Sequence, residues 1–206
     1  MTREQEGKII ARVLGGDTDA FEALVTEYEK NVYNLALKMT GNTEDAADLS
    51  QETFIKAFHS LGCFRGDSKF SVWLYRIVSN VCLDFLRRRS RRQTVSLSME
   101  DEDGEETQLD IPDERQTPEL LLEKRMTREA VRRGFAQLPP EPRQILLLRE
   151  IQGLSYEEIA SVLGIESGTV KSRIFRARKK LCAFLLADGN LPDYISSSKQ
   201  GGGETP

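Results

Sequence analysis

Cysteine and histidine are scarce in this sequence. Its 206 residues include three cysteines and one histidine. Cys63, Cys82 and Cys182 are widely spaced and odd in number, which argues against a disulfide framework and fits a reducing compartment. A zinc site of Cys and His ligands would need all three cysteines together with His59, so we expect no metal site. The neighbours of His59 are typical of a helix end rather than a cleft, and we interpret it as an ordinary helical residue.

Long apolar runs and phosphate-binding loops are also missing. The longest apolar run, 181–187, has seven residues, whereas a membrane helix needs roughly 20. The first residues lack the apolar region of a secretory signal, so we expect a cytoplasmic protein without stable membrane insertion. Gly15 and Gly16 are not followed by the Gly-Lys-Ser/Thr of a nucleotide-binding loop. Because a paired-carboxylate motif on a plausible strand is missing too, we expect neither enzymatic activity nor a cofactor.

The charge is unevenly distributed along the chain. The formal net charge is -4, yet residues 100–119 alone hold ten acids against one base. Such a stretch cannot bury enough apolar surface to offset the entropy of ordering, and it predicts an acidic flexible linker over 96–116. The flanking segments, 1–95 and 117–187, are then two small helical domains. The last residues, 188–206, are rich in serine and glycine and predict a disordered tail.

Two basic clusters stand out, one just before this linker and one near the end of the chain. One holds five arginines over 87–92, and the other holds six basic and no acidic residues over 171–180. A single run of charge is as often a solvated face as a binding site. Two clusters, one in each domain, favour a polyanion that is contacted at two places.

The periodicity of apolar residues predicts an all-α protein. Helices are expected over 3–14, from Thr18 to Gly41, from Thr43 to Gly62, and from Lys69 into the arginine cluster, and no segment alternates as a strand would. The third helix has an acidic polar side opposite its apolar side. That side is either solvated surface or a docking face for a basic partner.

The fourth expected helix carries aromatic residues beside basic ones. Its apolar spacing leaves Trp73, Tyr75, Arg76 and Asn80 as candidates for exposure. Aromatic rings stack on bases while cations follow the backbone, so this pattern is typical of single-stranded DNA binding. The alternative is that Trp73 and Tyr75 are core aromatics.

The most specific signal lies near the end of the chain. Ser155 and Glu158 form a capping box, Gly164 permits a sharp turn, and a basic helix begins near Ser167. Its apolar residues from Val170 onward fall on one side, which leaves the basic residues outside. Two short helices with a tight turn predict a DNA-binding helix-turn-helix, with a plain helical hairpin as the alternative.

Three stretches of the sequence resemble the extracytoplasmic-function (ECF) sigma factors of the sigma-70 family. They are 45–58 (DAADLSQETFIKAF), 64–68 (FRGDS) followed by 73–77 (WLYRI), and 154–178 with its core GTVKSR. The resemblance implies a region 2 helical bundle joined by the acidic linker to a region 4 helix-turn-helix. It also implies a subunit that directs core RNA polymerase to promoters. A stand-alone helix-turn-helix regulator remains the alternative.

The resemblance further implies partners and residue roles. The β′ clamp helices of core RNA polymerase would contact Asp48, Gln51, Glu52 and Phe54, and the β flap would be a further contact. The minus-ten element, opened to single strands, would be bound by Phe64, Arg65, Asp67, Ser68, Trp73, Tyr75, Arg76 and Asn80. The double-stranded minus-thirty-five element would be bound by Lys171, Ser172, Arg173, Phe175, Arg176 and Lys179, because arginine can bond a guanine edge and phenylalanine can contact a thymine methyl. An anti-sigma factor is expected as an inhibitor.

Overall fold

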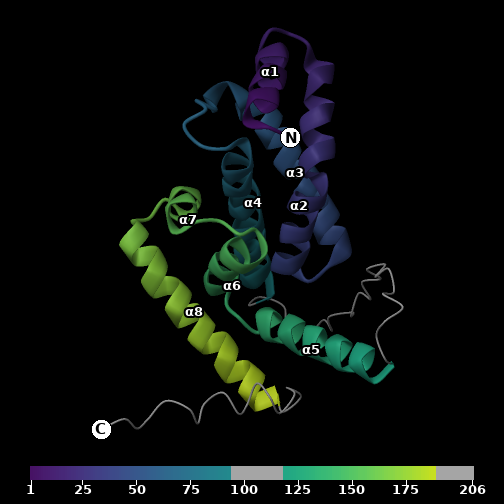
Figure 1. Cartoon of the computed structure of the whole chain (residues 1–206), viewed down its shortest axis with the longest axis vertical. Helices are drawn as coiled ribbons and strands as arrows, with labels where there is room; N and C mark the ends of the chain where they lie inside the picture. The colour runs from purple at the N-terminus through teal and green to yellow at the C-terminus, as the bar shows by residue number, and fades with distance from the viewer. Residues whose placement is uncertain (94–117, 189–206) are drawn as a thin grey trace.

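A computed structural model describes residues 1–93 and 118–188, and within these two ranges the chain is helical and contains no strand. The expected all-α fold is therefore confirmed. The predicted linker, 96–116, and all but the first residue of the predicted tail lie outside the described residues. In Figure 1 the purple-to-blue helices of the first part fill the upper part of the view, and the green-to-yellow helices of the second part lie below them and, at α7, beside α4.

The first part of the chain is a bundle around one core. Its elements are α1 (Arg3–Leu14), η1 (Thr18–Phe21), α2 (Glu22–Thr40), α3 (Thr43–Ser60), η2 (Leu61–Cys63) and α4 (Phe70–Gln93). Helices α2, α3 and α4 pack on one another and bury Leu24, Val32, Leu35, Met39, Leu61, Phe70, Leu74 and Val78. Those of α2 are spaced by eight, three and four positions and those of α4 by four, which places them on one face of each helix.

Local residues determine where these helices begin and end. Thr2 and Gln5 form a capping box at the start of α1. Gly41, with a φ of +74°, ends α2, and the Asn42 side chain then accepts a hydrogen bond from the Asp45 N–H at 2.9 Å to begin α3. A residue in the left-handed conformation ends a helix, and a polar residue directly after it can cap the start of the next. The connection from α2 to α3 therefore needs only two residues.

The second part contains the expected helix-turn-helix. It consists of α5 (Pro118–Ala136), α6 (Pro140–Leu146), the wider turn η3 (Leu147–Ile151), α7 (Tyr156–Leu163) and α8 (Ser167–Asp188). The capping box of α7 is formed: the Ser155 side chain accepts from the Glu158 N–H at 3.1 Å, and Glu158 accepts from the Ser155 N–H at 2.9 Å. Gly164 adopts a φ of +64° and makes the turn into α8.

The two parts pack against each other, with α7 on α4 and α6 beside the ends of α2 and α4. Lys69 pairs with Glu158 at 3.0 Å, and Arg87 pairs with Glu141 at 3.4 Å. No helix of the described ranges is long and apolar enough to cross a lipid bilayer.

Arg143 joins the two parts without a carboxylate. Its guanidinium donates to the carbonyl of Met39 in the last turn of α2 and to those of Ala136 and Leu138 before α6. Carbonyls at a helix end have no partner inside the helix, so a cation there is favourable. Burial lowers the pKa of Arg143 from its ordinary value.

Candidate nucleic-acid interface

Helix α8 has one buried face and one basic face. Val170, Ile174 and Ala177 are buried against the second part of the chain. All the residues predicted to bind the minus-thirty-five element are exposed on this helix: Lys171, Ser172, Arg173, Phe175, Arg176 and Lys179. Taking about 100° per residue, all of these except Arg173 fall within an arc of about 140°. The structure therefore gathers most of the predicted set on one surface.

The side chains of this surface are available to a ligand. Phe175 is 70% exposed, although an apolar ring of this size is usually buried. Arg178 pairs with Glu150 at 2.6 Å, whereas Lys171, Arg176 and Lys179 have no carboxylate partner among the described residues. The surface is thus positive, and it fits the phosphates and base edges of a DNA groove.

The loop 64–68, which precedes α4, packs against a cluster of aromatic rings. The ring of Phe64 lies 5.4 Å from that of Trp73 and 5.6 Å from that of Phe70, and Phe70 lies 5.5 Å from Trp73. Phe64 and Trp73 are half-buried by these contacts, while Arg65 and Asp67 between them are exposed. Ser68, half-buried, donates to the carbonyl of its neighbour Lys69 at 3.3 Å. The aromatic residues therefore form the base of the loop, and the charged residues form its accessible edge.

Tyr75 corrects one expectation drawn from the sequence. Its side chain is 5% exposed, so of the two interpretations left open, exposure was wrong for Tyr75 and the core aromatic is confirmed. Tyr75 shares the inner stripe of α4 with Val78 and Cys82, and its hydroxyl is hydrogen-bonded to Asn31 of α2. Burial raises its pKa from the ordinary value of a tyrosine. On the outer side of α4, Arg76 and Asn80 are exposed as expected.

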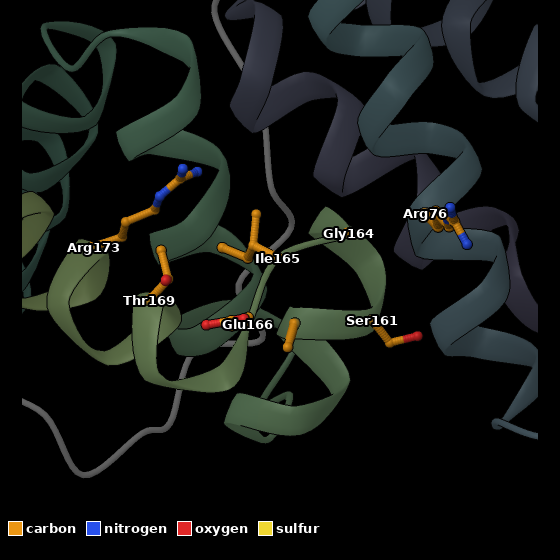
Figure 2. A pocket seen from close by; sticks show the side chains of 8 residues that line it. Arg76, Ser161, Gly164, Ile165, Glu166, Thr169 and Arg173 are labelled. Carbon is orange, nitrogen blue, oxygen red and sulfur yellow. The ribbon is translucent and has the colours of Figure 1, made fainter.

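An open cleft of about 610 Å³ is lined by Arg76 of α4 together with residues of α7, the turn and α8. Figure 2 shows Arg76 on α4 on one side of it, and Ser161, Thr169 and Arg173 of the helix-turn-helix on the other. The sequence assigned Arg76 and Arg173 to two different DNA elements. The fold brings both to the same cleft, and no local pattern in the sequence signals that proximity.

Helix α3 presents a mixed acidic and apolar surface. Asp48 and Gln51 are exposed, Glu52 is half-buried and pairs with Lys56 at 2.7 Å, and Phe54 is half-buried against the core.

The sequence interpretation missed two apolar residues of the same surface. Ile55 is 51% exposed, and Phe58 is 36% exposed with its ring against Phe21 at 5.2 Å. Spacing by three, four and three residues places Asp48, Gln51, Ile55 and Phe58 on one helix face. A helical wheel shows that they share this face, but only the packing of the other helices decides that the face stays uncovered.

The sequence matches two family models that cover most of both described parts. Residues 24–92 match the model for sigma-70 region 2, and residues 128–181 match that for sigma-70 region 4. The RNA polymerase sigma-H factor of Pseudomonas aeruginosa is 40% identical over 185 residues, which cover 88% of this chain and 94% of that protein. The ECF RNA polymerase sigma-E factor of Escherichia coli K12 is 40% identical over 175 residues, which cover 84% of this chain and 90% of that protein.

The chain is an ECF sigma factor. As a member of the sigma-70 family, it directs RNA polymerase to initiate transcription at promoters. The helix-turn-helix described above belongs to its region 4, and the bundle of α2, α3 and α4 belongs to its region 2. The resemblance seen in the sequence is therefore confirmed.

Two solved structures resemble this one along most of its length. The sigma factor RpoE from Bartonella quintana, in complex with the anti-sigma factor NepR, has a TM-score of 0.63 and 25% identity, covering 82% of this sigma factor and 98% of that chain. CnrH in complex with the cytosolic domain of CnrY has a TM-score of 0.61 and 29% identity, covering 87% and 96% of the two chains.

Proposed function

We propose that the sigma factor binds core RNA polymerase through α3, the minus-ten element through the loop and outer side of α4, and the minus-thirty-five element through α8. Residues 1–95 and 117–187 then act as separate DNA-contacting domains in the cytoplasm, joined by 96–116. The observation that carries this proposal is the surface of α8, where unpaired cations and an exposed phenylalanine lie opposite a buried apolar stripe.

The α3 surface is the proposed contact with the β′ clamp helices of the polymerase. It comprises Asp48, Gln51, Glu52 and Phe54, and we add Ile55 and Phe58 because they share its exposed side. Carboxylates around apolar side chains fit a partner helix with basic residues around an apolar stripe. Burial of the apolar side chains stabilises such a contact, and the charged side chains determine how the partner helix is oriented on α3.

A change of charge on α3 tests this contact. Asp48→Arg should abolish binding to purified core polymerase, because it places a cation where a basic partner docks. Glu29→Arg makes the same change of charge on the exposed side of α2 and should leave binding near the wild-type level. Circular dichroism checks that both variants fold. Retained binding by Asp48→Arg would show that the acidic face is only solvated surface.

The minus-ten role is assigned to the loop and to the outer side of α4. Arg65, Asp67, Arg76 and Asn80 are exposed there, and Trp73 is positioned by Phe64 and Phe70. Capture of an unstacked base offsets the few kcal/mol that unstacking costs. Tyr75 contributes from the core by fixing α4 against α2 rather than by touching DNA.

Promoter binding with and without polymerase separates this proposal from a stand-alone regulator. The sigma factor should protect a promoter fragment only when core polymerase is present. Tight protection of the same fragment by the sigma factor alone, unchanged by polymerase, would favour the stand-alone regulator.

An anti-sigma factor is the proposed inhibitor. One of the similar solved structures is the sigma factor RpoE in complex with the anti-sigma factor NepR. This inhibitor would have to cover either the α3 surface or the DNA-binding surfaces to be effective.

A further inference from the structure

Helix α1 has no role in the function proposed so far. It precedes the segment that matches region 2, which begins at residue 24. Nevertheless, α1 contacts η2, the short helix that leads into the loop 64–68. Its residues also reach both the exposed edge and the aromatic base of that loop.

Arg3 contacts the exposed edge. Its guanidinium donates a hydrogen bond to the carbonyl of Gly66. Gly66 has a φ of +76°, a left-handed conformation that other residues rarely adopt, and it lies between the exposed Arg65 and Asp67. Fixing this carbonyl fixes the peptide that joins Gly66 to Asp67 and restricts the directions of both charged side chains.

Glu6 is linked to the aromatic base of the loop indirectly, by its contact with Tyr28. Its side chain is 7% exposed, and its carboxylate accepts a hydrogen bond from the Tyr28 hydroxyl. A buried carboxylate needs such a donor, so this bond fixes α1 to α2 at one register. The ring of Tyr28 lies 5.5 Å from Phe70, which in turn contacts Phe64 and Trp73.

We infer that α1 positions the loop 64–68 for the minus-ten strand, with Arg3 as its positioning residue. Ordering a free loop costs about 1–2 kcal/mol for each residue. If the loop is already ordered before DNA binds, this free energy of ordering does not reduce the affinity for DNA. The inference rests on the proposed role of the loop, and it gives α1 a part in promoter opening although α1 need not touch DNA.

Arg3→Ala tests the inference, with Arg12→Ala as its matched control. Arg12 lies at the other end of α1 and pairs with Asp17 at 2.6 Å, far along the helix from Gly66. Both positions are exposed, so both variants should fold. Arg3→Lys keeps a cation that can donate to the carbonyl and should restore function in part.

Two measurements report on the loop. Trp73 is the only tryptophan of the chain, so acrylamide quenching of the free sigma factor reports on the aromatic base. We expect stronger quenching in Arg3→Ala than in the wild type or Arg12→Ala. With core polymerase added, the non-template strand of a transcribed promoter should bind Arg3→Ala about three- to tenfold more weakly, the range expected for one lost hydrogen bond.

The salt dependence of strand binding shows whether Arg3 positions the loop or contacts the DNA strand itself. A positioning residue leaves the slope of log affinity against log salt unchanged, whereas loss of a phosphate contact lowers it by about one. A lowered slope in Arg3→Ala, or wild-type quenching and affinity, would overturn the inference. Asp67→Ala is measured in parallel. If it weakens strand binding while Arg3→Ala does not, only the inference fails; if neither does, the proposed role of the loop fails with it.

Discussion

Arg176 and Lys179 lie one turn apart on the exposed side of α8, yet their side chains differ in what they can recognise. The Nε of Arg176 donates to the carbonyl of Ser172 at 3.3 Å, which orients the planar guanidinium. A guanidinium can bond both acceptors of a guanine edge, whereas an ammonium acts as a point charge that suits phosphate. We therefore expect Arg176 to contribute to sequence preference and Lys179 to contribute to affinity.

Alanine substitutions at these two positions should have different effects. Arg176→Ala should weaken binding of the holoenzyme to its promoter by about 1–3 kcal/mol and relax the preference at one base pair. Lys179→Ala should weaken binding to all sequences alike and flatten the salt dependence. Affinity measurements on promoter variants over a range of salt concentrations check both. An equal loss on every sequence for Arg176→Ala would contradict base recognition.

At the scale of the element, the start of α7 depends on two side chains, of which Glu158 also contacts the first part of the chain. Ser155 caps the helix, and the carboxylate of Glu158 accepts from the Ser155 N–H while pairing with Lys69. The bond from the Ser155 backbone, followed by the Lys69 partner, holds the pKa of Glu158 below its ordinary value. A lowered folded-state pKa stabilises the fold above the unfolded pKa and loses that contribution as pH falls through the folded pKa.

Ser155→Ala should destabilise the sigma factor by about 1 kcal/mol, because an N–H at the start of α7 loses its acceptor. Glu158→Gln should reduce the loss of stability on acidification, since the group that takes up the proton is removed. Urea denaturation at neutral pH and near pH 4 measures both effects. The same acid sensitivity in Glu158→Gln and wild type would exclude Glu158 as a source of it.

At the scale of the whole molecule, the described arrangement is too compact to contact both promoter elements. Their names place them about 25 base pairs apart, or roughly 85 Å at about 3.4 Å per base pair. Helix α7 lies directly on α4, and Arg76 and Arg173 line one cleft. If the two parts bind the two elements as proposed, we expect them to separate when the promoter is bound.

Two natural cysteines can report this separation. Cys63 in the first part and Cys182 on α8 are exposed, whereas Cys82 is buried and burial raises the pKa of its thiol to about 12. Maleimide dyes should therefore label the two exposed thiols selectively. Energy transfer between the dyes should fall when core polymerase and promoter are added to the free chain. Unchanged transfer in a transcribing complex would contradict the separation.

The helices, their caps and the basic surface of α8 could be predicted from the sequence because each depends on neighbours within one or two turns. Ser155 with Glu158, Gly164 and the spacing of Val170, Ile174 and Ala177 are all local signals. Tyr75 and Phe58 could not be placed in this way. Helical spacing groups each of them with other residues of one face, but neighbouring helices decide whether that face is covered.

The sequence by itself determined an all-α chain, its helix-turn-helix and its family, since helical periodicity, capping and motif spacing are properties of short segments. Only the tertiary structure decided that Tyr75 lies inside and Phe58 outside, that Arg143 joins the two parts, and that Arg3 reaches Gly66. These contacts join residues remote in sequence, and their energies depend on how whole helices pack rather than on any local pattern.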